Sequence, residues 1–302
     1  METVTVFGAD GVLGAAVARR VSRSCGLSVK AVDPDGNGQY NAEMKKSGVQ
    51  VIQCNLNDVK SIKKVISGSK AVFFNTVSNF RNPNFLNKEI AQGRNIADVC
   101  SALKIKHVVF CTELHPIRIS GIAARHLVAK AEIEEYMRYK GIPLTNLIVP
   151  TLYEDLVGIL KPEYAGNERL LIIPMGTTPL DMICADDVGE IVRVIINNRS
   201  AHINRTHSVS GDKITIKEMA HYLSKHLRPL CFRDKQVTIH EYQEMYSPRP
   251  WAQDYANMFD FFLRVDQRYN VDATRRIIPK LTLTGFEEWV AKNSQKLCYA
   301  FS

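Results

Sequence analysis

The chain has 302 residues, of which 45% are hydrophobic and 23% are charged, as in a globular protein with a sizeable core. Its 39 lysines and arginines outnumber its 31 aspartates and glutamates, so the formal net charge is +8. The basic residues are spread along the chain without interleaved aromatic residues, which argues against direct nucleic-acid binding. No apolar run approaches the ~18 residues of a membrane span, so membrane insertion is not expected.

The cysteines and the N-terminus indicate the compartment. The 7 cysteines are scattered and form no C-x-x-C pair, which favours free thiols in a reducing compartment over a zinc site. The N-terminus enters a strand-like segment almost at once, which leaves no room for a targeting peptide. We therefore expect a cytoplasmic protein, with the nucleus as a second compartment.

The first segment with functional meaning is T-V-T-V-F-G-A-D-G-V-L-G, residues 3–14. It predicts a strand, a glycine-rich turn and a helix, the entry to a dinucleotide-binding βαβ unit. Gly8 would permit the tight turn, Gly11 the approach of a pyrophosphate, and Gly14 the close packing of helix on strand. The alternative is a turn that keeps its shape without a ligand, because the Asp10 carboxylate could cap the helix and repel a phosphate.

The segments that follow alternate between short apolar runs and helical stretches. We expect strands at 28–33, 49–53, 71–75, 107–111 and 144–149, and helices at 59–66, 86–103 and 123–140. This alternation predicts an α/β fold with a Rossmann-type doubly wound parallel sheet. Proline and glycine become denser after residue 150. We expect an NAD(P)-binding Rossmann domain over 1–150, and over 151–302 the last sheet strands and a smaller C-terminal α+β lid domain that binds partners.

Asp33 stands at the end of the second expected strand, where an acidic residue binds the ribose hydroxyls of NAD and repels the 2′-phosphate of NADP. The turn after it, residues 34–38, contains no arginine or lysine that could bind that phosphate. The alternative is that Asp33 is only a turn residue at the end of a strand.

A reductase of the short-chain type needs a tyrosine four residues before a lysine on one helix, so that both project from the same face. Lys130 supplies the lysine, but His126 stands at the tyrosine position, and Thr112 is the candidate for the hydroxyl residue after the fifth strand. His126 could act as an acid or be structural. Lys130 would bind the nicotinamide ribose, or act in catalysis if the protein is an enzyme. We expect no metal site, and we expect Asp186 and Asp187 to cap the helix that follows them.

Four segments together resemble the NmrA-like family, atypical relatives of the short-chain dehydrogenases, and in particular its vertebrate members that sense the NADPH/NADP ratio. The segments are residues 6–14, 130–136, 150–156 and 254–261, the last followed by 283–289. The resemblance implies a cofactor site at Gly8, Ala9, Asp10, Gly11, Val12, Leu13, Asp33, Leu56, Asn57, Val77, Ser78, Asn79, Gln92, Lys130, Leu152, Tyr153, Glu154 and Asp155.

The resemblance also implies a function. Family members are redox sensors without established dehydrogenase activity that bind NADP, contact metabolic enzymes or transcription regulators, and form homodimers according to cofactor occupancy. This chain departs from the family at Asp10, at Asp33-Pro34, where the family has Thr-Arg, and at Asn55. These departures predict weak NADP(H) binding, with NAD(H) preferred. The alternatives are a reductase that uses Lys130, as in isoflavone-reductase-like enzymes, and a cofactor-free scaffold.

Overall fold

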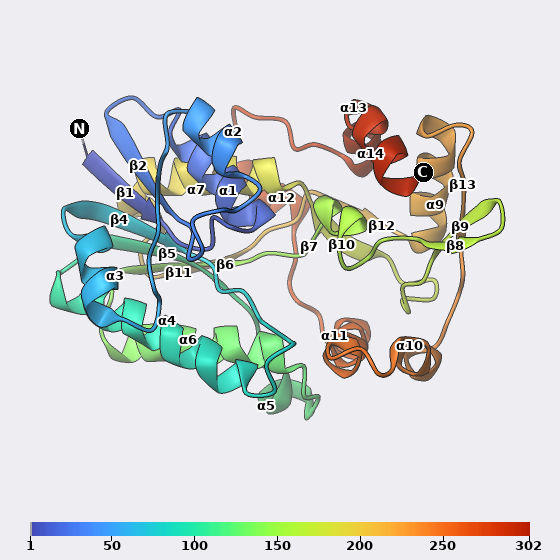
Figure 1. The fold of residues 1–302 in the computed structure, drawn as a ribbon, viewed down its shortest axis with the longest axis horizontal. Helices are drawn as coiled ribbons and strands as arrows, with labels where there is room; N and C mark the ends of the chain where they lie inside the picture. The colour runs from blue at the N-terminus through green and yellow to red at the C-terminus, as the bar shows by residue number, and fades with distance from the viewer. Residues whose placement is uncertain (1) are drawn as a thin grey trace.

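The structure is a computed structural model that describes residues 2–302. Its larger part is a seven-stranded parallel sheet with helices on both faces, which confirms the predicted Rossmann-type fold (Figure 1). The strand order is β11-β6-β5-β4-β1-β2-β3. The strands are β1 (Glu2–Val6), β2 (Leu27–Val32), β3 (Gln50–Ile52), β4 (Ser69–Phe74), β5 (His107–Thr112), β6 (Leu144–Ile148) and β11 (Arg205–Ser208).

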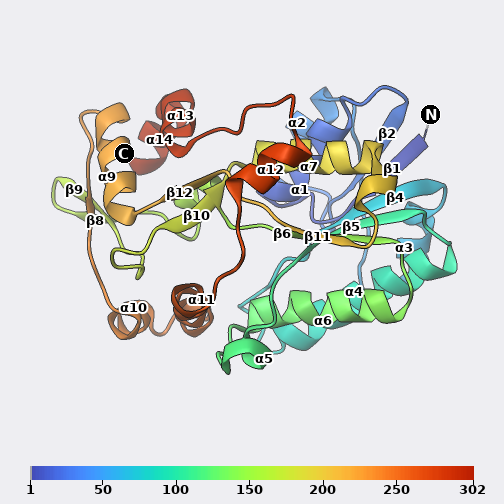
Figure 2. The same ribbon diagram turned by 180° about the vertical axis from the view of Figure 1, so that it is seen from behind.

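The helices form two layers. One face of the sheet carries α1 (Val12–Val21), α2 (Asn41–Lys46), α7 (Ala185–Asn197) and α12 (Val271–Ile277), and the other carries α3 (Val59–Ile66), α4 (Phe85–Ala102) and α6 (Arg125–Tyr139), as Figures 1 and 2 show. The short helices α5 (Pro116–Ser120) and α8 (Arg199–His202) lie in connections. The expected helices at 59–66, 86–103 and 123–140 are thus present, with ends that differ by at most about two residues.

The central strands are buried on both faces, as the crossover helices of a parallel sheet require. Every residue of β5 is buried, which explains why its sequence is a continuous run of mostly apolar residues rather than an alternation. The strand β3, at the edge of the sheet, is only three residues long and is incompletely buried. The carboxyl ends of all these strands meet at one edge, which is where ligands bind in such folds.

Close packing of α1 on α7 holds the first helix in place. Gly189 lies in α7 where a Cβ atom would stand 2.9 Å from the backbone oxygen of Ala16, so a side chain there would push the helices apart. The packing of α1 against α7 therefore fixes the position of α1 and of the turn before it.

The smaller C-terminal part has a core of its own, built around residues such as Tyr153, Phe259 and Trp289. It contains two three-stranded sheets, β12-β10-β7 and β13-β9-β8. Its strands are β7 (Thr151–Leu152), β8 (Glu163–Ala165), β9 (Glu168–Leu171), β10 (Leu180–Ile183), β12 (Asp212–Ile214) and β13 (Cys231–Asp234). Its helices are the 3₁₀ helix η1 (Tyr153–Val157), α9 (Ile216–His226), α10 (Ile239–Tyr246), α11 (Ala252–Arg264), α13 (Phe286–Lys292) and α14 (Ser294–Phe301).

The chain after residue 150 contributes to both parts. Helices α7 and α12 and strand β11 belong to the larger layer, and Ile278 and Leu283 pack into its core. The division at residue 150 stays a prediction. Among residues 2–302, no helix combines the length and apolar character needed to cross a bilayer.

Candidate functional site

The turn between β1 and α1 has the geometry that its glycines predict. Gly8 adopts a φ of +76°, and a Cβ on it would lie 2.5 Å from the backbone oxygen of Asn75. A Cβ on Gly14 would lie 2.2 Å from the backbone oxygen of Gly8. Gly11 differs, because its φ is −93° and the nearest atom to its Cβ position is 3.5 Å away. Folding therefore requires Gly8 and Gly14, whereas Gly11 has room that a ligand could use.

The alternative in which Asp10 caps α1 is not found in the structure. Gly11 is the N-cap residue of α1, and within residues 2–302 no side chain makes a capping hydrogen bond there. The amide groups of the first turn are thus left for solvent or for an anionic ligand, the arrangement that binds phosphates. Asp10 borders the same space. Burial raises the pKa of Asp10, and the nearby charges of Asp33 and Asp35 add to that rise.

A cleft of about 620 Å³ runs along the carboxyl ends of β1, β2, β3 and β4. Of the predicted cofactor residues, it brings together Gly8, Asp10, Leu56, Asn57, Val77, Ser78, Asn79 and Gln92. The amide of Gln92 donates a hydrogen bond to Asn57 Oδ1 at 3.1 Å, and Asn95 donates to the backbone oxygen of Leu56 at 3.1 Å, so α4 holds the loop after β3. The cleft lies where dinucleotides bind in such folds.

The other predicted cofactor residues lie elsewhere. Ala9 and Leu13 are buried in the core behind the turn, and Leu152 and Tyr153 are buried where η1 begins. The Tyr153 hydroxyl donates to the backbone oxygen of Thr284 at 3.1 Å. The structure therefore does not bring these side chains to the cleft described above.

Asp33 is turned inward, away from the cleft. Its side chain is only 1% exposed, and its carboxylate accepts hydrogen bonds from Asp35 N at 3.2 Å, Gly38 N at 2.7 Å and Asn41 Nδ2 at 2.7 Å. Burial raises the pKa of Asp33, but these hydrogen bonds outweigh it, so the net shift is downward. The carboxylate organises its own loop, and Pro34 and Asp35 line the cleft in its place.

Lys130 does not line this cleft, but it contacts the loop after β4, which does. Its amine donates to Thr76 O at 2.8 Å, to Thr76 Oγ1 at 2.9 Å and to Asn75 Oδ1 at 3.4 Å. Glu89, buried in α4, places Oε1 3.8 Å from the amine, and its other oxygen accepts from Ser78. Helix α6 thus places Lys130, paired with Glu89, beside the loop after β4. The nicotinamide end of a dinucleotide would lie at this loop.

His126 is a buried, neutral side chain. It is 8% exposed, its ring stacks on Tyr255 with centroids 5.2 Å apart, and its Nε2 lies 3.4 Å from Met258 Sδ. Burial lowers the pKa of His126 to about 4. At neutral pH the imidazole is therefore uncharged and lacks the readily lost proton of an imidazolium, which makes it a poor replacement for the acidic tyrosine of a short-chain dehydrogenase. Thr112 is buried as well.

The C-terminal segment 254–261 contacts the start of α6 through its first residue, Asp254. Asp254, fully buried in α11, accepts hydrogen bonds from Arg125 N at 2.9 Å, Nε at 3.0 Å and Nη2 at 2.6 Å. These bonds fasten the start of α6 to the C-terminal part. Because Lys130 lies on the same helix, Asp254 helps to fix the lysine's position.

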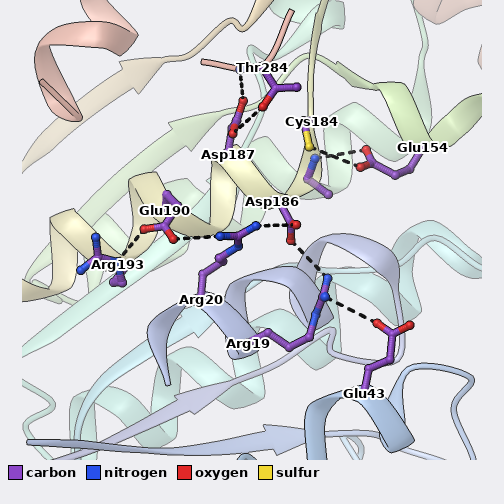
Figure 3. Close-up of polar contacts among 11 residues, drawn as sticks. Arg19, Arg20, Glu43, Glu154, Cys184, Asp186, Asp187, Glu190, Arg193 and Thr284 are labelled. Atoms are coloured by element: carbon purple, nitrogen blue, oxygen red, sulfur yellow. Dashed lines mark hydrogen bonds and ion pairs between the residues drawn. The ribbon is translucent and has the colours of Figure 1, made fainter. Parts of the chain in front are cut away.

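A second polar cluster joins α1 to α7 (Figure 3). The Asp186 carboxylate forms ion pairs with Arg20 at 2.6 Å and with Arg19 at 3.2 Å. The predicted capping of α7 by Asp186 and Asp187 is therefore wrong. The N-cap of α7 is Cys184, and Asp187 instead accepts from Thr284 N at 2.7 Å. Glu190 forms ion pairs with Arg20 and with Arg193. Glu43 forms a further ion pair with Arg19.

Glu154 and Asp155 also hold the chain together. The Glu154 carboxylate accepts from Ala185 N at 3.1 Å at the start of α7, as Figure 3 shows, and Asp155 accepts from Leu152 N at 2.9 Å. Both residues border a second cleft of about 620 Å³ on the α1–α7 side, as does Val12. Burial raises the pKa of Glu154, and it raises that of Asp155 to about 6.

Sequence reasoning missed three polar residues of the site, namely Asn75, Lys88 and Glu89. Glu89 carried a detectable signal, because it lies on the same helical face as Phe85 and Gly93, both buried. A glutamate on an apolar face is seldom left without a partner. That partner, Lys130, could not be identified from sequence.

Comparisons with known proteins agree with this geometry. Residues 1–290 match the model of the NmrA-like family. An NmrA-like family domain-containing protein from Dictyostelium discoideum is 26% identical over 307 aligned residues, which cover 97% of this chain and 98% of that protein. The expected likeness to vertebrate members finds no support in this relative.

Two solved structures share the fold. NmrA, described as a negative transcriptional regulator, has a TM-score of 0.80 at 17% identity over 99% of this chain and 97% of that one, and it has been solved with NADP and with NAD. A Citrobacter sp. triphenylmethane reductase complexed with NADP(H) has a TM-score of 0.76 at 19% identity over 97% of this chain and 100% of that one.

Proposed function

The chain belongs to the NmrA-like family, and from that premise we propose that it is a regulator that binds a nicotinamide dinucleotide and responds to its redox state. The proposal rests on two observations: the cleft is open, and the tyrosine that donates a proton in short-chain dehydrogenases is replaced by His126. The cleft keeps its glycine turn and its uncapped α1, while the tyrosine position holds the buried imidazole of His126. Binding can persist where tyrosine-based catalysis cannot.

The residues present fit a dinucleotide in a defined direction. The uncapped first turn of α1 would bind the pyrophosphate, with Gly11 leaving space for it. Leu56, Asn57 and Gln92 would border the adenosine half, and Lys130 the nicotinamide ribose. The bound dinucleotide would supply hydride chemistry, and the residues of this chain would bind and orient it.

The charge of the cleft supports NAD(H) over NADP(H). Asp10 and Asp35 line its adenosine end, and the buried Asp33 carboxylate lies behind them. A 2′-phosphate would bring further negative charge beside these carboxylates, with no arginine in the turn at 34–38 to bind it.

Fluorescence titration of NADH and NADPH against the full chain tests both points. We expect NADH to bind more tightly, and Pro34→Arg to raise the affinity for NADPH by pairing a guanidinium with the 2′-phosphate. Clearly tighter binding of NADPH to the unmodified chain would contradict the preference. If neither dinucleotide binds, the cofactor-free scaffold remains.

We infer that the regulator acts through protein contacts, with metabolic enzymes or transcription regulators as partners and a homodimer whose formation depends on the dinucleotide, in the cytoplasm or nucleus. Light scattering with and without NADH tests the dimer. An unchanged oligomeric state in both conditions would remove that part of the proposal.

The second candidate is an NAD(P)H-dependent reductase, favoured by the placement of Lys130 beside the loop after β4. Steady oxidation of NADH or NADPH with quinones or activated alkenes as acceptors would support it, provided that Lys130→Ala abolishes the rate. Dinucleotide binding without turnover supports the regulator.

A further inference from the structure

A cavity of about 410 Å³ opens at the amino ends of the central strands, at the edge of the sheet opposite to the dinucleotide cleft. Its walls come from residues near the starts of four neighbouring strands, β5, β4, β1 and β2, and from the end of α7 and the start of α8. These segments lie on the side of the molecule farthest from the C-terminal part (Figures 1 and 2). The volume is that of a site for a small molecule.

Arg199, the first residue of α8, lines this cavity without a charged partner. The residue is only partly exposed, and its Nη1 is buried with no hydrogen-bond partner among residues 2–302. The edge formed by Nε and Nη2 also makes no hydrogen bond to these residues, but both nitrogens stay accessible. Glu2 is the one carboxylate among the described lining residues, and it forms its ion pair with Lys70 instead. A partly buried cation without a partner is costly, so Arg199 marks a place for an anion.

No other group at the cavity compensates this charge within the described part of the chain. His107 is buried at the start of β5, and burial together with the charges of His202 and Arg199 lowers its pKa to about 4, so it is neutral at pH 7. The end of α7 carries a partial negative charge, but a helix terminus is equivalent to only about half an elementary charge. Asn198 and Ser200, both exposed, add an amide and a hydroxyl donor at the rim. The cavity therefore favours a single negative charge.

Apolar side chains form much of the remaining wall, namely Val4, Leu27, Ala71 and Ile196. Val4 and Ala71 are buried beneath the cavity, whereas Leu27 and Ile196 are partly exposed to it. An inorganic anion would leave this surface in contact with water, whereas an anion with an apolar chain would cover it. A carboxylate also matches the guanidinium edge, because its two oxygens accept two parallel N–H bonds.

We propose that this cavity binds a monocarboxylate with a short apolar chain. Its carboxylate pairs with the Nε–Nη2 edge of Arg199, and its chain lies against Val4, Leu27 and Ile196. One unpaired arginine matches one negative charge. The cavity and the dinucleotide cleft lie at opposite edges of the sheet, so the inference goes beyond the proposed function and does not depend on it.

The probe is hexanoate, whose binding to the full chain is followed by ligand-observed NMR, with 1-hexanol and acetate as comparisons. We expect hexanoate to bind. The uncharged 1-hexanol and the chainless acetate should each bind at least about tenfold more weakly, because each lacks one of the two contacts. Raising NaCl from about 50 mM to about 500 mM should weaken hexanoate binding, because salt screens the ion pair.

Two substitutions should move the hexanoate affinity in opposite directions. Arg199→Gln should lower it by at least about tenfold, because the charged hydrogen bonds are lost. Glu2→Gln releases Lys70 from its ion pair and makes the cavity more positive, so it should raise the affinity a few-fold. The matched control is Arg276→Gln, exposed in α12, which contacts the segment after the carboxyl end of β11 and should leave binding unchanged. Thermal unfolding shows whether each variant is folded. If Arg199→Gln does not fold, the gain in Glu2→Gln decides the matter.

Three outcomes would overturn the proposal: no binding of hexanoate to the unmodified chain, equal binding of 1-hexanol and hexanoate, or full affinity in a folded Arg199→Gln variant. NADH distinguishes the two sites, because it should leave bound hexanoate in place. Displacement of hexanoate by NADH would locate the carboxylate in the dinucleotide cleft and contradict the assignment. Failure of NADH to bind at all would remove the proposed function while leaving the hexanoate test unaffected.

Discussion

Two acidic side chains near the cleft, Asp33 and Glu113, have opposite surroundings. At the adenosine end, three donors from its own loop satisfy the Asp33 carboxylate. Beyond Lys130, Glu113 Oε2 is buried without a partner among the described residues. The Asp33 carboxylate thus organises its own loop, whereas Glu113 keeps an unpaired oxygen beside a separate pocket. Selectivity between dinucleotides is therefore to be sought at the first position, where the loop is fixed.

Gly14→Val should have the largest effect, because its Cβ would lie 2.2 Å from the backbone oxygen of Gly8 and 2.8 Å from Ala9 N. Backbone atoms cannot move aside as a flexible side chain can, so we expect the free energy of unfolding to fall by about 3 kcal/mol or more. Thermal unfolding measures this as a fall of at least about 6 °C. The matched control is Gly285→Ala, where the nearest atom lies 3.6 Å from the Cβ position. Equal effects at the two glycines would show that the turn is not tightly constrained.

Asp33→Ala should come next, with a loss of about 2 kcal/mol, because three donors, one of them the buried Asn41 amide, lose their acceptor. The net pKa shift of Asp33 is downward, so its stabilisation is present above the unfolded-state pKa of about 3.9 and is lost as pH falls through the lower folded-state value. Denaturant titrations between pH 7 and 3 should show a flatter acid limb for the variant. An unchanged stability combined with altered cofactor affinity would instead mean that Asp33 contacts the ribose.

His126→Phe separates a structural histidine from a catalytic one. In the unmodified chain, the folded state holds the pKa of His126 near 4, below the unfolded value of about 6.5, so stability is lost as pH falls between these values. Phenylalanine removes this dependence, by at most about 1.4 kcal/mol per pH unit, and should preserve dinucleotide binding. Substituting the exposed His240 in the same way should leave the pH profile unchanged. Loss of NADH affinity in a stable His126→Phe variant would point to a direct role.

Asp35→Asn should have the smallest effect, because the side chain is exposed and its charge is screened. We expect the NADPH affinity to rise a few-fold while the NADH affinity and the unfolding midpoint stay unchanged. Asp272→Asn, exposed in the distant helix α12, is the control. If the ratio of NADPH affinity to NADH affinity does not change, the electrostatic explanation of cofactor preference at the adenosine end is wrong.

Much of the architecture was predictable because it depends on local patterns. A strand was predicted at 107–111, where the run Val108–Cys111 is apolar without alternation, as is typical of strands buried on both faces, and β5 is such a strand. An aspartate before a helical pattern is a typical N-cap, and the Asp58 carboxylate accepts from Lys60 N at 2.9 Å. Gly8 and Gly14 predicted a turn that tolerates no side chain, which their packing confirms.

The hydrogen-bond and ion-pair partners of the acidic side chains were not predictable, because these partners lie far apart in the sequence. Asp10 and Asp186 each precede or open a helix, which suggested caps, but the distant Arg19 and Arg20 pair with Asp186, and Asp10 lines the cleft. Asp33 could have faced a ribose or its own loop, and the position of Asn41 determined which.

By itself, the amino-acid sequence determined the parallel sheet, the glycine turn and the family, because these rest on spacing and on steric limits at single residues. The tertiary structure decided the chemical state of the polar side chains. Glu113, His126 and Lys130 differ in burial and in partners, and those differences arise only when α4, α6 and α11 pack around the end of the sheet. Burial and pairing set the charge of each group, and they are properties of the packed chain rather than of any segment.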